Sequence, residues 1–251
     1  MNKRELVLLK KISKEAVRLD WEKAFNGKAK GNKHLFRVNK IAKFLQKREG
    51  GNLFLILTSA WVHDVSLAYD CNESEKNINK NTRQFLSQFN LLPNEINKIA
   101  QYSSSHESGR KNIPIEAKIV HDSDVIDKGG ILGIIRHVWK MTNLLEKRIL
   151  SNKEDLAQVK KHLKERERKV FTKTSKKIVK RLNKKRDEFF TNEDRAIELM
   201  NQISIKANKG INSDKIALFL IKTEKIYISE ILRNQLDCSY LNLRIKENYK
   251  E

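Results

Sequence analysis

The sequence has very few of the residues that turn-rich folds require. Of its 251 residues, 2 are proline and 9 are glycine. β-Sandwiches and barrels place these residues in their many turns, so their scarcity argues against both architectures. Leucine, isoleucine, lysine and glutamate instead recur in long periodic stretches, which is typical of helices joined by short polar loops. We therefore predict an all-α fold.

Cysteines and long apolar runs are also scarce. Cys71 and Cys238 lie far apart and no C-x-x-C motif is present, so a disulfide framework is not expected and the reducing cytoplasm is the predicted location. The apolar run at 6–9 is too short for the core of a signal peptide. No run of about 18 apolar residues occurs, so we expect neither a transmembrane helix nor a membrane partner.

Positive charge is abundant and unevenly distributed. Lys and Arg total 52 against 31 Asp and Glu, which gives a formal net charge of +21. The stretch 147–190 alone holds 17 Lys and Arg and 6 Asp and Glu. A basic surface of this kind attracts nucleotides or nucleic acid. The alternative is a solvated helix face in a Lys- and Asn-rich chain, and the charge pattern leaves both interpretations open.

Apolar periodicity predicts a single bundle of about eight to ten helices. The strongest signal is the stretch 52–68, which is apolar nearly all round and is expected to be a central buried helix. Further helices are predicted at 2–19, 33–49, 81–91, 93–103, 114–127, 131–168 with an interruption near Asn152, 172–190 and 192–207. Residues 1–207 are expected to form one domain. Residues 208–251 form a C-terminal extension, packed or appended, that is helical or contains a short strand at 225–228.

Four polar residues occupy apolar helix faces, where their burial needs an explanation. His34 lies on the same side of the helix 33–49 as its apolar residues. His63 and Asp64 lie near the end of the central helix, and Asp124 has apolar neighbours. Imidazole and carboxylate groups are costly to bury without partners, and one divalent cation would satisfy all four. Two nitrogens and two carboxylates suit Mn²⁺, Fe²⁺, Co²⁺, Ni²⁺ or Zn²⁺, with Mg²⁺ less suited to imidazole. Taken singly, each residue also fits an ordinary hydrogen-bonded core position.

The order and spacing of the four residues resemble the H…HD…D signature of the HD-domain superfamily of metal-dependent phosphohydrolases. The segments HLFRV at 34–38 and AWVHDV at 60–65 are similar to the family's two histidine helices. EAKIVHDSDVIDKGGILGIIR at 116–136 and FTKTSKKIVKRLNKKRDEFF at 171–190 resemble one branch, the small single-domain predicted HD hydrolases of bacteria and archaea. The resemblance covers about 15–207 and implies an HD-type helical bundle with a basic C-terminal helical extension.

The resemblance implies that His34, His63, Asp64 and Asp124 are the metal ligands, with Asp122 as the neighbouring alternative to Asp124. It also implies hydrolysis of a phosphoester or phosphoanhydride bond, commonly in a nucleotide. A divalent cation acidifies water and polarises the phosphoryl oxygen. Asp64 could orient or deprotonate that water. The resemblance does not separate a phosphomonoesterase, a phosphodiesterase and a nucleotide pyrophosphohydrolase.

Further residues are candidates for binding the substrate. His106 lies in a polar loop where the same branch also carries a histidine, and it could donate a proton, bind phosphate or ligate a second metal. His121 is a second candidate ligand of such a metal. Arg37, Lys128 and Arg136 could neutralise the reacting phosphate. For the last two, a structural ion pair with a nearby aspartate is an equal alternative.

Two other functions remain open on the sequence. The same metal centre could serve a nuclease that grips nucleic acid with the basic stretch 147–190, or the site could be degenerate and regulatory. The four intact ligand positions argue against the degenerate site. The residues after Asp64 lack the acidic or basic groups that nucleotide-cleaving relatives carry in the next turn or two, so the acid or base beyond the metal shell is undecided. His137 and His162 have no supporting pattern, and an oligomer is compatible with the sequence.

Overall fold

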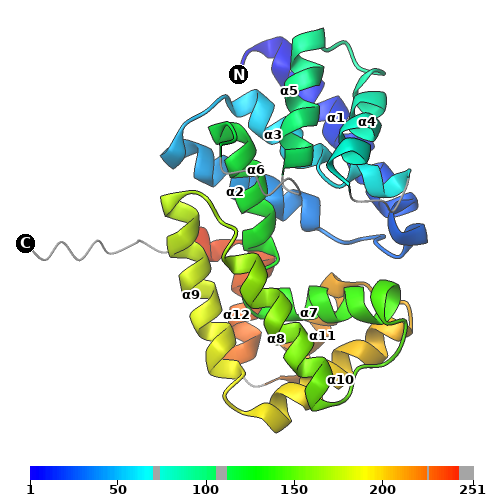
Figure 1. Cartoon of the computed structure of the whole chain (residues 1–251), viewed down its shortest axis with the longest axis vertical. Helices are drawn as coiled ribbons and strands as arrows, with labels where there is room; N and C mark the ends of the chain where they lie inside the picture. Colours follow the sequence, from blue (N-terminus) through cyan, green and yellow to red (C-terminus); the bar gives the residue numbers. More distant parts are fainter. Residues whose placement is uncertain (70–73, 106–111, 225, 243–251) are drawn as a thin grey trace, which may run out of the picture.

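The computed structural model describes residues 1–69, 74–105, 112–224 and 226–242 (Figure 1). These residues form helices and no strand, which confirms the predicted all-α fold. Within the same ranges, every helix is too short or too polar to span a bilayer. The helices are α1 (Lys3–Glu22), α2 (His34–Glu49), α3 (Leu53–Val62), α4 (Glu75–Leu86), α5 (Pro93–Ser104), α6 (Ile115–Asp127), α7 (Gly130–Lys140), α8 (Lys153–Glu167), α9 (Lys173–Phe189), α10 (Glu193–Asn208), α11 (Ser213–Thr223) and α12 (Ile226–Asp237).

Asparagine sets the starting point of many of these helices. In α1, α3, α8, α10 and α11 an asparagine is the N-cap, and its side chain accepts a hydrogen bond from the backbone N–H three residues later. A cap of this type satisfies one of the N–H groups that the first turn leaves unpaired, and it stabilises a helix by about 1 kcal/mol. Several asparagines of the chain therefore stabilise the first turns of its helices.

The apolar side chains gather in three clusters. The helices that form these clusters follow one another along the long axis of the molecule (Figure 1). The upper cluster joins α1, α3, α4 and α5, and includes Ile12 and Phe85. The middle cluster joins α2, α3, α6 and α9, and includes Ile41 and Ile126. The lower cluster joins α7, α8, α10, α11 and α12. Helices α2 and α6 pack against each other in the middle of the molecule, where the candidate site lies.

Several helix boundaries differ from those expected, and one of the differences affects the site. The central helix was expected to reach residue 68, but α3 ends at Val62 and is followed by a turn and the 3-10 helix Val65–Ala68. His63 and Asp64 therefore lie in the turn rather than on a continuous helix. This turn changes the direction of the chain, so the two neighbouring side chains can approach the same point.

The remaining differences concern the more polar segments. The helix predicted at 81–91 starts earlier, since α4 begins at Glu75 with Ser74 as its cap. The predicted helix at 131–168 is broken over a longer stretch, because α7 ends in the π-helical turn Met141–Leu145 and α8 starts only at Lys153. The strand alternative at 225–228 was wrong for the described part of that segment, which is the start of α12.

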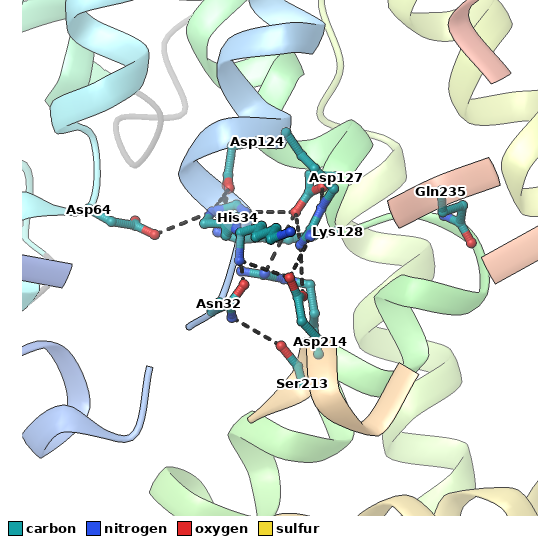
Figure 2. A network of polar contacts seen from close by, with 12 residues as sticks. Asn32, His34, Asp64, Asp124, Asp127, Lys128, Ser213, Asp214 and Gln235 are labelled. Atoms are coloured by element: carbon teal, nitrogen blue, oxygen red, sulfur yellow. Dashed lines mark hydrogen bonds and ion pairs between the residues drawn. The ribbon is translucent and has the colours of Figure 1, made fainter. Parts of the chain in front are cut away.

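The segment after residue 207 packs into the lower cluster through α11 and α12, and into the middle cluster through Cys238, Tyr240 and Leu241. Ile216 of α11 and Leu232 of α12 share this cluster with α7 and α10. Gln235 accepts a hydrogen bond from the Leu132 N–H at 3.1 Å and donates one to the Gly129 carbonyl at 3.0 Å. The segment therefore supports the corner between α6 and α7, which immediately follows Asp124 on α6 (Figure 2).

Gly133 allows a close approach at this corner, which gives a test of the packing. A Cβ atom at Gly133 would lie 2.2 Å from the backbone carbonyl oxygen of Lys128, which cannot move without shifting α6. We predict that Gly133→Ala lowers the free energy of unfolding by about 1–3 kcal/mol or more, measured by urea denaturation. Gly129→Ala is the matched control, because its nearest atom would be 3.2 Å away. Equal losses in the two variants would contradict the close-approach argument.

Candidate metal centre

Three separate segments bring the predicted ligands together in the middle of the molecule (Figure 2). His34 is the first residue of α2, His63 and Asp64 lie in the turn after α3, and Asp124 lies on α6. Helix α2 packs against both α3 and α6, so the contacts between helices fix the relative positions of all four residues. The side chains are deeply buried: His34, His63 and Asp124 are 4%, 2% and 5% exposed.

The donor atoms of these residues converge on one point. His34, His63 and Asp124 each offer a ligand atom within 4.8 Å of the other two. The Nε2 atoms of the two imidazoles are 3.2 Å apart. Oδ1 of Asp124 lies 3.1 Å from the His34 Nε2 and 3.5 Å from the His63 Nε2. Asp64 also contacts both rings, with Oδ2 3.3 Å from the His34 Nε2 and Oδ1 3.4 Å from the His63 Nε2.

Hydrogen bonds on the far side of each ring fix its tautomer. Nδ1 of His34 is 2.7 Å from Oδ2 of Asp127, and Nδ1 of His63 is 2.9 Å from the Ala60 carbonyl oxygen. A carbonyl oxygen or an ionised carboxylate only accepts, so Nδ1 donates and each neutral ring presents a lone pair at Nε2. Two lone pairs then face each other beside two anionic groups. A cation between the rings would attract both Nε2 atoms and both carboxylates. The hydrogen bonds at the two Nδ1 atoms are of the kind that metal-bound histidines make.

The carboxylate of Asp124 fits the same interpretation. Its Oδ2 accepts a hydrogen bond from Lys128 Nζ at 2.7 Å, whereas the buried Oδ1 has no hydrogen-bond partner in the described part of the chain, although the Lys128 ammonium lies within ion-pair distance. The Lys128 ammonium, 2.6 Å from this oxygen, offsets part of the cost of burying the carboxylate, and the same oxygen also lies 3.1 Å from the His34 Nε2 inside the cluster. Nitrogen and carboxylate donors together suit a divalent transition metal. The residues present therefore fit a metal ion.

The electrostatics of the cluster show that it requires positive charge. Burial and the charge of Arg136 lower the pKa of His34, but the hydrogen bonds that the imidazolium donates to Asp124, Asp127 and Asp64 outweigh them and raise the pKa to about 9. Burial raises the pKa of Asp124, but the charge of Lys128 and contacts with the two imidazoles hold it well below its usual range. The carboxylates thus stay ionised. Without a metal ion, the imidazole of His34 takes up a proton in place of the metal.

A chain of ion pairs holds His34 in position (Figure 2). Asp127 accepts from His34 through Oδ2 and from Arg37 Nε through Oδ1, at 2.7 and 2.5 Å. Arg37 continues the chain by donating from Nη1 to Oδ2 of Asp214 at 2.7 Å. The same oxygen of Asp214 accepts from the Lys33 backbone N–H at 2.8 Å, directly before the ligand. Asp214 lies on α11, so the C-terminal segment contributes to the metal centre.

This chain places Arg37 between two carboxylates, and its substrate contact stays a prediction. The residue is 3% exposed, and its guanidinium donates to two protein carboxylates in the described chain. Neither Asp127 nor Asp214 was predicted to hold Arg37 and His34 in place. A signal existed for Asp127, because it follows Asp124 by three residues and therefore lies near it on the same helix. No local pattern points to Asp214, which is far away in the sequence.

The other predicted phosphate-binding cations lie closer to an opening. Lys128 pairs with Asp124, and Nη1 of Arg136 is 3.6 Å from Oδ2 of Asp127. The Nε and Nη1 atoms of Arg136 are buried and make no hydrogen bond to the described residues. Both side chains line the cavity that Asp64 also lines. Their substrate contact stays a prediction, but the cavity gives both of them access to a ligand.

The structure separates Asp124 from its neighbour Asp122. The carboxylate of Asp122 accepts hydrogen bonds from the backbone N–H groups of Phe171 and Thr172 and from the Thr172 hydroxyl, so it anchors the start of α9. His121 lies 3.2 Å from this carboxylate rather than in the ligand cluster. His106 falls outside the described residues. A second metal at His106 and His121 therefore stays a prediction.

Comparison with known proteins agrees with this geometry. The family model of the HD domain matches residues 32–129, a range that contains all four predicted ligands. The chain carries an HD domain. HD domains bind divalent metal ions, and His34, His63 and Asp124 are the candidate ligands in this one. The HD family consists in general of metal-dependent hydrolases.

A solved structure has a similar fold over a larger part of the chain than residues 32–129. The crystal structure of Bacillus subtilis YpgQ matches 77% of this chain and 95% of its own, with 21% identity and a TM-score of 0.56. At this identity the match concerns the fold alone. Among curated proteins no significant match was found. The shared fold extends beyond the 32–129 match of the HD domain.

The ion-pair chain behind His34 predicts a loss of metal affinity when Asp127 is changed. Asp127→Asn removes the charge that orients the imidazole and places an amide against Arg37, so we expect Mn²⁺ to bind about 10–100-fold more weakly, measured by calorimetry. Asp194→Asn, at an exposed position in α10, is the control and should bind Mn²⁺ like the wild type. Unchanged affinity in a folded Asp127→Asn protein would show that the chain does not support the metal centre.

Proposed function

We propose that the HD domain hydrolyses a phosphoester or phosphoanhydride bond of a small phosphate-containing substrate, a nucleotide above all. The ligands of its divalent cation are His34, His63, Asp64 and Asp124. The observation that carries the proposal is the pair of Nε2 atoms 3.2 Å apart, flanked by two carboxylates. This arrangement has no use in an ordinary core, where each imidazole would need its own hydrogen-bond partner.

The bound cation would supply Lewis-acid activation of water and of the phosphoryl oxygen. Asp64 differs from Asp124 in its access to solvent, because its side chain is 16% exposed against 7% and it lines the cavity. A carboxylate that contacts both imidazoles and also faces the cavity can accept a proton from water there. Asp64 is therefore assigned two roles, as a ligand and as the group that orients or deprotonates the attacking water.

The cavity beside Asp64 is suited to an anionic substrate. Asp64 is its only acidic lining residue among those described, whereas five lining residues are basic: Lys28, Lys128, Arg136, Lys140 and Arg166. A concave site with this charge concentrates phosphate compounds and neutralises the charge that develops during hydrolysis.

Arg136 is the strongest candidate for direct contact with the reacting phosphate. It lines the cavity together with Asp64, and two of its guanidinium nitrogens make no hydrogen bond to the described residues. A phosphate in the cavity could accept from the guanidinium of Arg136, whose planar group offers paired N–H donors to phosphate oxygens. The weak 3.6 Å ion pair with Asp127 would persist beside such a contact.

A nuclease that uses the basic stretch 147–190 is the second hypothesis. The structure divides that stretch: His162 and Arg166 of α8 line the cavity, whereas the lysines of α9 border a separate hollow with Glu167 and Asp187. His34, His63 and Asp124 are also buried, and Asp64 is the candidate ligand that lines the cavity. A small substrate can enter such a site more readily than a duplex, so we favour the small substrate.

A substrate screen tests the proposal. We predict that nucleotides and generic phosphate esters are hydrolysed with Mn²⁺, Co²⁺, Ni²⁺ or Mg²⁺, and that Asp64→Ala lowers kcat/KM at least about 100-fold. Asp194→Asn serves as the control for removing an exposed carboxylate. Hydrolysis that survives Asp64→Ala unchanged would remove the mechanism. Faster cleavage of an oligonucleotide than of any small substrate would instead favour the nuclease.

A further inference from the structure

Two histidines stack against each other in the cavity, away from the ligand cluster. The rings of His137 and His162 have centroids 3.7 Å apart and an angle of 1° between their planes. His137 lies on α7 and is 8% exposed, while His162 lies on α8 and is half-buried. Both line the same cavity as Asp64, so a single ligand in the cavity can reach the ligand cluster and the stack.

The charges that act on this stack are positive. Burial, together with the charges of Arg166 and Lys140, lowers the pKa of His137 to about 3 and that of His162 to about 4. Both rings are therefore neutral near pH 7, and each retains one N–H donor. The stack thus adds two donors to a region of positive potential, which suits an anion and opposes a second metal ion.

Arg166 contributes to this potential without a matching carboxylate. Most buried or half-buried arginines of the chain pair with an acidic side chain: Arg37 with Asp127, Arg186 with Glu167 and Arg195 with Glu224. Among the described residues no acidic group forms an ion pair with Arg166, although its side chain is half-buried and lines the cavity. A partly desolvated guanidinium of this kind is stabilised by an anionic ligand.

We propose that His137, Lys140, His162 and Arg166 form an anion subsite that binds a second phosphate group of the substrate. The inference rests on the proposed function, because the first phosphate is the one at the metal centre. It narrows the substrate class to compounds that carry a chain of two or more phosphates, either nucleotides or inorganic polyphosphate. Arg166 and Lys140 supply the charge, and the two imidazoles supply neutral N–H donors.

Binding of inorganic tripolyphosphate to the metal-free full-length protein tests the subsite by itself. Chelator treatment followed by dialysis removes metal, and titration calorimetry then gives Kd. Arg166→Gln should weaken binding about tenfold or more, because it removes a charge-assisted hydrogen bond. His162→Phe keeps a ring that can stack on His137 but removes the donor, and it should also weaken binding. Lys161→Gln is the matched control, since Lys161 is an exposed residue of α8 that does not line the cavity.

The outcomes are distinct. A loss in Arg166→Gln and His162→Phe, with Lys161→Gln within about twofold of the wild type, supports the subsite. Equal losses of affinity in all three variants would show only a general attraction of tripolyphosphate to a basic protein. Unchanged binding by a folded His162→Phe protein would show that the stacked rings serve only packing. Either result overturns the proposal. Absence of tripolyphosphate binding by the wild type also overturns it. These results do not depend on metal, so a failure of the hydrolase proposal is recognised separately.

A nucleoside triphosphate distinguishes the two sources of a phosphate chain. If it binds more tightly than tripolyphosphate and loses affinity in the same two variants, the base and sugar add contacts and a nucleotide is the ligand. Equal affinity of the two compounds identifies the phosphate chain alone as the group that is recognised. In both cases the second phosphate occupies the proposed subsite.

Discussion

The site depends on two imidazole nitrogens that face each other at 3.2 Å with their lone pairs directed inward. Neither ring can rotate freely, because Asp127 and the Ala60 carbonyl each hold the opposite nitrogen. Burial prevents water from screening the repulsion, and the nearby carboxylates add negative charge. A cation is the simplest group that satisfies all of these atoms. Without a metal ion, a proton on His34 occupies this place, so binding of the metal is coupled to loss of that proton.

The convergence of the candidate ligands was predictable because it follows from local patterns. His34 sits in register with the apolar stripe of α2, and His63-Asp64 follows a run that is buried nearly all round. The glycines at 129–130 mark the corner that ends α6 after Asp124. Each of these features lies within a few residues of the ligand that it positions. The all-α fold was predictable for the same reason, since helices are specified by periodicity and capping over short distances.

Contacts between distant segments were not predictable in the same way. The sequence shows that Arg37 is charged but not that Asp127 and Asp214 bind it, so a substrate contact was as natural an expectation. His137 and His162 are 25 residues apart on two helices, and a broken helical segment separates them. The turn at His63 was missed because the apolar run continues through Val65 and does not mark the end of α3. Such contacts depend on tertiary packing, which propensity does not encode.

The most direct test of the account is a crystal structure of the protein grown with Zn²⁺ or Mn²⁺, with the ion located by its anomalous scattering. We predict one strong peak between the rings, about 2.0–2.2 Å from the Nε2 atoms of His34 and His63 and from a carboxylate oxygen of Asp124. Asp64 should contact the same ion. A fully loaded protein whose ion lies elsewhere, with the two Nε2 atoms still facing each other and no metal between them, would contradict the central claim.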